Sequence, residues 1–164
     1  MEEVAKILNS QIELIVERVK KFYGEWEESK QKLEKINNIF ADNAIDKYIV
    51  EAKQFGELKI ITYSFDGINQ NDMKNLSIKI FKKASESITV FTSKEKQGII
   101  LLGLLGSEAS RKSNLNMGKI IKTCVQNFGG KGGGNTDYGQ GLIFDKTIKE
   151  TAILEYCINL IKKS

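Results

Sequence analysis

The 164-residue sequence contains no histidine and no proline, and only two cysteines and one tryptophan. The lack of histidine removes the commonest general base and a common zinc ligand, which argues against hydrolase and zinc chemistry in this chain. No proline interrupts any helix or strand. Cys124 and Cys157 form no CxxC pair, and each lies in an apolar helical pattern. We therefore expect two buried, reduced thiols.

Long apolar runs and a signal peptide are also missing, so we expect a cytoplasmic protein that does not enter a membrane. The net charge of +4 is unevenly distributed. Residues 1–52 hold 8 Lys/Arg against 11 Asp/Glu, whereas residues 53–164 hold 17 against 10. The second part is therefore basic, which suits a polyanionic partner, although lysine-rich surfaces are common in proteins without one.

The first 52 residues read as a helical subdomain. Glu2 to Leu8 is expected to form a short helix, and Ser10 to Glu13 has the capping-box pattern that starts a second, long helix. From there apolar residues recur in steps of three and four, as in a coiled coil that dimerises two chains. An intramolecular helical hairpin is the alternative, and Gly24 is the weakest point of the long helix. The expected dimer interface consists of Ile12, Ile15, Val19, Phe22, Trp26, Leu33, Ile36 and Phe40.

Residues 53–164 are predicted to form a globular α+β subdomain with the element order β-α-β-β-α-β-α. Strands are expected at 58–65, 87–93, 98–105 and 142–144, since these segments are apolar and rich in β-branched residues. Helices are expected at 71–84 and 116–128. A last helix is predicted to begin at an Asp145 cap.

The sequence "GGKGGGNTDYGQG" carries half of the chain's 14 glycines between Gly129 and Gly141. It is no Walker A loop, because Lys131 is followed by glycine, and it lacks the third glycine of a dinucleotide fingerprint. Consecutive glycines in a loop let backbone N–H groups converge on an anion, with Lys131 adding a positive charge. A flexible linker is the alternative to such a binding loop.

The same motif resembles the signature G-G-K-G-G-G-R-P-D-M-A-Q-G of the C-terminal domain of alanyl-tRNA synthetases, a DHH-associated domain. The long helix, the strand ending at Asp66-Gly67 and the element order are similar to that family, and "FYGEWEE" resembles its archaeal members. Asn135 and Thr136 stand where the family has Arg-Pro. The resemblance implies a non-catalytic module that dimerises an alanine–tRNA ligase and binds the outer corner of tRNA, in support of aminoacylation and editing.

The resemblance implies no cofactor and no catalytic residue in this chain, because ATP, Mg and Zn are bound by other domains of the synthetase. The chain then resembles a part of a longer enzyme or a stand-alone relative. The alternatives are the substrate-binding domain of a DHH phosphodiesterase, whose motif usually carries a histidine, and a purely structural oligomerisation domain. The expected tRNA-binding residues are Gly129, Gly130, Lys131, Gly132, Gly133, Gly134, Asn135, Asp137, Gln140, Arg111, Lys112, Lys119 and Lys122.

Overall fold

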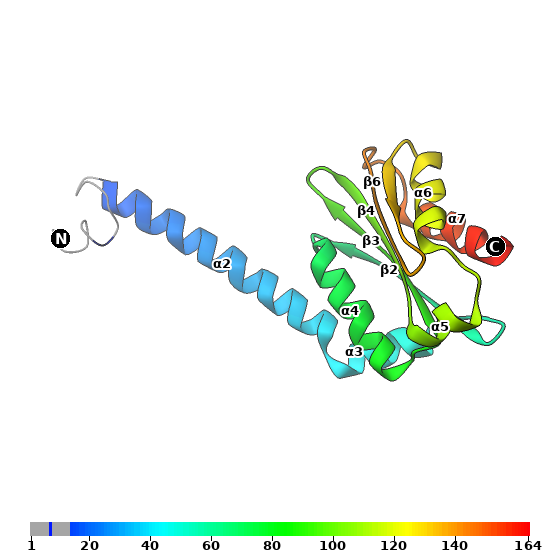
Figure 1. The fold of residues 1–164 in the computed structure, drawn as a ribbon. Coiled ribbons are helices and arrows are strands. Elements are labelled where there is room, and N and C mark those ends of the chain that lie inside the picture. The colour runs from blue at the N-terminus through cyan, green and yellow to red at the C-terminus, as the bar shows by residue number, and fades with distance from the viewer. Residues whose placement is uncertain (1–6, 8–13) are drawn as a thin grey trace. The chain divides into compact units, whose positions relative to one another are not determined.

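The computed structural model describes residue 7 and residues 14–164 and divides the chain into two compact units, residues 1–39 and 40–164. The division lies earlier than the expected boundary between residues 52 and 53. Most of the described part of the first unit is the helix α2 (Ile15–Phe40), drawn in blue in Figure 1, whose last residue already belongs to the second unit. The predicted short helix at Glu2 to Leu8, the capping box and the interface residue Ile12 lie outside the described residues.

The long helical segment breaks at Ala41 and not at Gly24. Ala41 has an extended backbone and precedes a separate helix, α3 (Asp42–Val50), which belongs to the second unit. Gly24 lies in the interior of α2, and a Cβ added there would meet no atom within 4 Å. A single glycine costs an α-helix only about 1 kcal/mol relative to alanine, so a helix of 26 residues can contain it.

Gly24→Ala should therefore stabilise α2 by about 1 kcal/mol, because alanine loses less backbone entropy than glycine in a helix. Thermal unfolding followed by far-UV circular dichroism at a fixed protein concentration measures the change. A lower melting temperature would contradict the prediction and would show that another surface approaches the bare backbone at this position.

The second unit contains a six-stranded sheet in the order β1-β2-β3-β4-β6-β5. Its strands are β1 (Lys53–Phe55), β2 (Leu58–Asp66), β3 (Ser87–Glu95), β4 (Gly98–Leu105), β5 (Lys131–Gly134) and β6 (Tyr138–Ile143). The neighbours β2 and β3 are parallel, since α4 (Gln70–Lys83) connects them, and the other neighbours are antiparallel. The predicted α+β class is confirmed. The strands β1 and β5 and the helix α5 (Ser107–Lys112) were not predicted.

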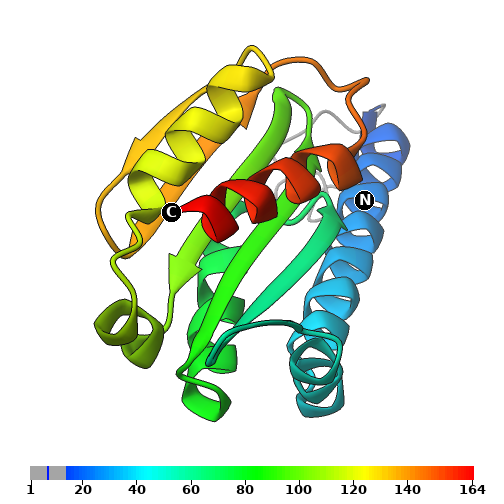
Figure 2. The ribbon, with the colours of Figure 1, turned by 90° about the vertical axis from the view of Figure 1, so that its right-hand side faces the viewer.

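Helices cover both faces of this sheet. Figure 2 shows α6 (Met117–Asn127, yellow) and α7 (Glu150–Lys163, red) in front of the strands and α4 (green) behind them. The last helix begins later than predicted, because Asp145 stabilises a turn instead of a helix end. Its Oδ1 accepts hydrogen bonds from the backbone N and the hydroxyl of Thr147, at 2.8 and 2.6 Å.

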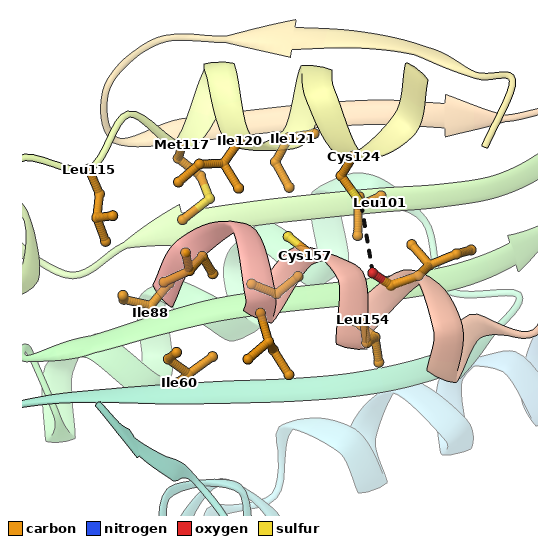
Figure 3. Close-up of a cluster of buried hydrophobic side chains, with 14 of the residues drawn as sticks. Ile60, Ile88, Leu101, Leu115, Met117, Ile120, Ile121, Cys124, Leu154 and Cys157 are labelled. Atoms are coloured by element: carbon orange, nitrogen blue, oxygen red, sulfur yellow. Dashed lines mark hydrogen bonds between the residues drawn. The ribbon is translucent and has the colours of Figure 1, made fainter. Parts of the chain in front are cut away.

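The larger part of the core lies between the sheet and the pair α6 and α7. Figure 3 shows Ile60, Ile88 and Leu101 of the sheet beneath side chains of both helices. Cys124 and Cys157 are fully buried among them, and the Cys124 thiol donates to the carbonyl of Ile153 at 3.7 Å. The neighbouring Cys124 thiol and burial hold the pKa of Cys157 above its ordinary value. Both thiols are buried as predicted and pack as small apolar side chains.

Candidate nucleic-acid interface

The glycine-rich stretch is a β-hairpin at one edge of the sheet, not a loop. Strand β5 pairs antiparallel with β6, and the register places Gly133 opposite Gln140 and Gly134 opposite Gly139. The N–H groups of Gly129 and Gly130 donate to carbonyls of the last turn of α6, at 3.2 and 2.7 Å. These two N–H groups close the helix, so they do not contribute to an anion-binding nest.

Close packing against α6 explains Gly139 and Gly141, whereas a Cβ on Gly130, Gly132 or Gly134 would lie closest to the backbone of β6. A Cβ on Gly139 would lie 2.6 Å from Cγ1 of Ile121, and one on Gly141 would lie 2.6 Å from Cγ1 of Val125. From the helix side, a Cβ on Gly118 would lie 2.5 Å from the carbonyl carbon of Gly134. The hairpin therefore approaches α6 to a distance at which no side chain fits between them.

The turn of the hairpin is held by its own polar groups. Asn135 Oδ1 accepts from the backbone N of Asp137 at 3.1 Å and of Tyr138 at 3.0 Å. The first turn of α6 donates to the carbonyls of Thr136 and Asn135, at 2.8 and 2.7 Å. Asp137 Oδ1 accepts from the hydroxyl of Ser110 at 2.5 Å. Asn135 is thus a turn-forming residue at the position where the resembling family carries arginine.

A cavity of about 480 Å³ lies on the other face of the hairpin. Because side chains alternate along a strand, Tyr138, Gln140 and Leu142 point away from α6. These three side chains line the cavity together with Gln70 from the start of α4, Ile100 of β4, Gln97, Lys131 and the glycines of β5. The cavity therefore combines an apolar floor with several amide groups.

Tyr138 joins the polar side chains of this cavity. Gln70 Nε2 donates to the Tyr138 hydroxyl at 2.5 Å, and that hydroxyl donates to Gln140 Oε1. Lys74 Nζ lies 5.4 Å from the centre of the Tyr138 ring, within the range of a cation–π contact. Burial raises the pKa of Tyr138, and the hydrogen bond from Gln70 acts in the opposite direction. The hydroxyl is therefore protonated at neutral pH and acts as a donor.

The predicted basic residues do not form one cluster. Lys131 lines the cavity, whereas Lys119 and Lys122 lie exposed on α6, which covers the opposite face of the sheet. Arg111 and Lys112 lie on α5, and Lys112 Nζ pairs with Glu57 at 3.4 Å and with Glu108 at 3.6 Å. The hydrogen bond with Glu57 and the charges of both carboxylates raise the pKa of Lys112.

Sequence reasoning missed six residues that line this cavity, namely Gln70, Gln97, Ile100, Tyr138, Gly141 and Leu142. The signal for Tyr138 was present, since Gly139 and Gly141 alternate with Tyr138, Gln140 and Leu142 at the period of a strand. Gln70 gave no local signal. It reaches the cavity only because β2 and α4 bring the start of that helix beside β6.

The expected interface residues on α2 are mostly exposed within the chain. The exposed fractions of Val19, Phe22, Trp26 and Leu33 lie between 48 and 61%, while Ile36 and Phe40 are half-buried and Ile15 is buried. Tyr23 packs beside Trp26 with ring centres 5.8 Å apart. The middle of α2 thus carries an apolar stripe of the kind that another surface usually covers.

The sequence profile of the DHHA1 domain family matches residues 57–163. The chain belongs to the DHHA1 domain family. The matched range contains the whole sheet except β1, together with the glycine hairpin and the cavity. The DHHA1 domain of this chain is thus the part that bears the candidate site, and α2 and α3 precede it.

The relatives of this chain include alanine–tRNA ligases, which confirms the predicted resemblance. The ligase of Methanosarcina mazei is 23% identical over 135 residues, covering 82% of this chain and 14% of the ligase. The ligase of Methanosarcina acetivorans is 22% identical over 160 residues, which cover 98% of this chain and 17% of the ligase. This DHHA1 chain therefore spans less than a fifth of the length of these two relatives.

Solved structures agree on the fold. The C-Ala domain from Aquifex aeolicus alanyl-tRNA synthetase is similar with a TM-score of 0.56 and 17% identity, over 68% of this chain and 98% of that domain. A DHH-domain protein described as a member of a family of ribosomal proteins gives a TM-score of 0.53 and 18% identity, over 92% of this chain and 33% of its own. Within the residues that the structure describes, no helix has both the length and the apolarity needed to cross a membrane.

Proposed function

We propose that this chain is a non-catalytic module of an alanine–tRNA ligase, which binds the outer corner of tRNA and forms a homodimer through α2. The observation that carries the proposal is the similarity to an alanine–tRNA ligase over 98% of the chain, which includes the helical part as well as the DHHA1 domain. In this role the chain supports aminoacylation and editing by holding tRNA, while the chemistry takes place elsewhere in the ligase.

The charge of the globular unit supports binding to a polyanion. Residues 40–164 hold 18 Lys/Arg against 13 Asp/Glu, so the unit that bears the cavity has an excess of positive charge. Contacts between lysines and phosphates release counterions, which makes the affinity fall steeply as the salt concentration rises. Folded RNA offers loops and exposed bases in addition to phosphates. We therefore expect tRNA to bind more tightly than a plain duplex of equal charge.

Lys131→Ala should weaken binding of tRNA several-fold and reduce the slope of log affinity against log salt by about one, as expected for one lost phosphate contact. Fluorescence anisotropy with labelled tRNA at several salt concentrations measures both quantities. Lys162→Ala is the matched control, because it removes the same charge from α7, on the face of the sheet opposite the cavity.

An unchanged affinity of Lys131→Ala at low salt would move the phosphate contact away from the hairpin. Arg111, Lys112, Lys119 and Lys122 would then be the residues to replace next. Equal losses in Lys131→Ala and Lys162→Ala would instead mean that the protein attracts RNA only through its overall charge.

The alternative, a substrate-binding domain of a DHH phosphodiesterase, has less support. This chain is only 18% identical to the solved DHH-domain protein, so that similarity concerns the fold alone. The phosphodiesterase motif usually carries a histidine, and this chain contains none. The polar side chain that follows the glycines here is Asn135, whose oxygen accepts two backbone hydrogen bonds of the turn. An amide that holds a turn supplies no general acid or base.

A further inference from the structure

We propose that the cavity beside the glycine hairpin binds one unpaired nucleobase of an RNA, an inference that rests on the proposed binding of tRNA. The volume of about 480 Å³ lies within the range of pockets that take a small organic ligand. Ile100 and Leu142 provide an apolar floor for a flat ring, and both side chains are only partly buried by the protein itself. Proteins read unpaired bases in such sites by stacking and by hydrogen bonds to the base edges.

The amide groups of the cavity are already oriented. Tyr138 accepts from Gln70 Nε2 and donates to Gln140 Oε1, so one hydroxyl fixes which way both amides face. This arrangement leaves Nε2 of Gln140 as a donor and Oε1 of Gln70 as an acceptor for a further partner. Adjacent donors and acceptors are what the edge of a nucleobase presents. The geometry therefore suits a base better than a purely apolar ligand or a simple anion.

Gly133 supplies an independent observation. Of the seven glycines between Gly129 and Gly141, Gly129 has a positive φ angle of 71°. Five others would place a Cβ closer than 3.0 Å to neighbouring atoms. Gly133 alone has neither constraint, since a Cβ there would meet nothing within 4 Å, and yet it lines the cavity. A bare backbone at this place allows a ligand to approach the strand closely.

The neighbouring positive charge fits the rest of a nucleotide. Lys131 precedes Gly132 on the same edge strand, lines the cavity and is exposed. A base in the cavity would bring its sugar and phosphate to the open edge of the sheet, where an ammonium group can contact the phosphate. The proposal therefore assigns the base to the amides and the apolar floor, and the phosphate to Lys131.

Gly133→Phe tests the proposal, because the phenyl ring fills the cavity without a clash of its Cβ with the protein. We expect this variant to bind tRNA about tenfold more weakly, which is the order of effect of losing one bound base. Gln140→Ala should give a smaller loss in the same direction. Gln54→Phe, at the opposite edge of the sheet on β1, is the matched control and should leave the affinity unchanged.

A second measurement uses the base alone. In nuclear magnetic resonance titrations of the wild-type chain, at least one nucleoside 5′-monophosphate should shift the amide signals of Gly133 and Gln140, whereas ribose 5-phosphate should not. Full tRNA affinity in Gly133→Phe, or equal shifts by ribose 5-phosphate, would overturn the base site and leave the proposed tRNA binding intact. A wild-type chain that binds no tRNA but responds to a monophosphate would support the base site and refute the proposed function.

Discussion

Gly139→Val should lower the free energy of unfolding of the DHHA1 domain by about 3 kcal/mol, at the upper end of the usual cost of overpacking. A Cβ at this position would lie 2.5 Å from the carbonyl oxygen of Met117 and 2.6 Å from Cγ1 of Ile121. The backbone of α6 cannot retreat without losing its contacts with the sheet, so the strain is not relieved by a rotamer change. Chemical denaturation with urea, followed by fluorescence and circular dichroism, measures the loss.

Gly133→Val is the matched control for this experiment. It introduces the same side chain into the neighbouring strand, one register step away, where a Cβ meets nothing within 4 Å. Valine favours extended strands more than glycine does, so the stability should stay the same or rise slightly, by less than about 1 kcal/mol. Equal destabilisation by both substitutions would contradict the close approach of α6 as the reason for the glycines.

The pair of variants also separates two roles within one motif. Gly139 and Gly141 face α6 and determine how closely the helix packs, whereas Gly133 faces the cavity. A substitution of Gly139 or Gly141 should change the stability of the domain, whereas a substitution of Gly133 should change which ligand fits into the cavity. A glycine motif that looks uniform in the sequence therefore combines a packing surface and a binding surface on the two faces of one hairpin.

Regular apolar patterns predicted most of the fold. The strands β3 and β4 and the helices α4 and α6 lie within three residues of their expected bounds, because each buries a continuous stripe that the sequence displays. The edge hairpin could not be predicted in this way. Its strands are rich in glycine, which is unfavourable in a sheet. They persist because β6 pairs with β4 and α6 packs directly against the backbone.

The break at Ala41 and the site itself depend on long-range contacts. Asp46 and Asp42 of α3 lie 2.8 and 3.8 Å from Nζ of Lys83 on α4, and Tyr48 packs edge-on to Tyr63 of β2 with ring centres 4.9 Å apart. These contacts draw α3 into the globular unit, although the apolar spacing alone allowed one continuous helix. In the same way Gln70 and Gln140, 70 residues apart in the chain, meet at Tyr138 only in the folded sheet.

Trp26→Glu should convert the proposed homodimer into monomers. Trp26 lies in the middle of the apolar stripe of α2 with 56% of its surface exposed, so a partner helix would cover it. A carboxylate in that place would lose much of its hydration between two helices. Lys30, whose Nζ lies 5.5 Å from the centre of the Trp26 ring, offsets this cost only in part, because an i,i+4 ion pair on a helix contributes about 0.5 kcal/mol or less. We expect the dissociation constant to rise about a hundredfold. Sedimentation velocity at tens of micromolar should show about twice the chain mass of 18.5 kDa for the wild type and the single mass for the variant.

Gln31→Glu is the matched control, because it adds the same charge to the same helix at the heptad position farthest from the apolar stripe. It should sediment as the wild type does, and circular dichroism should show α2 intact in both variants. A wild-type chain that is already monomeric would remove the dimer from the proposed function and leave the binding of tRNA to be judged separately. If the apolar stripe forms the interface, a charge should matter only when it lies on the face that carries the stripe. Dissociation by both substitutions would therefore mean that the net charge, and not the apolar stripe, decides whether two helices associate.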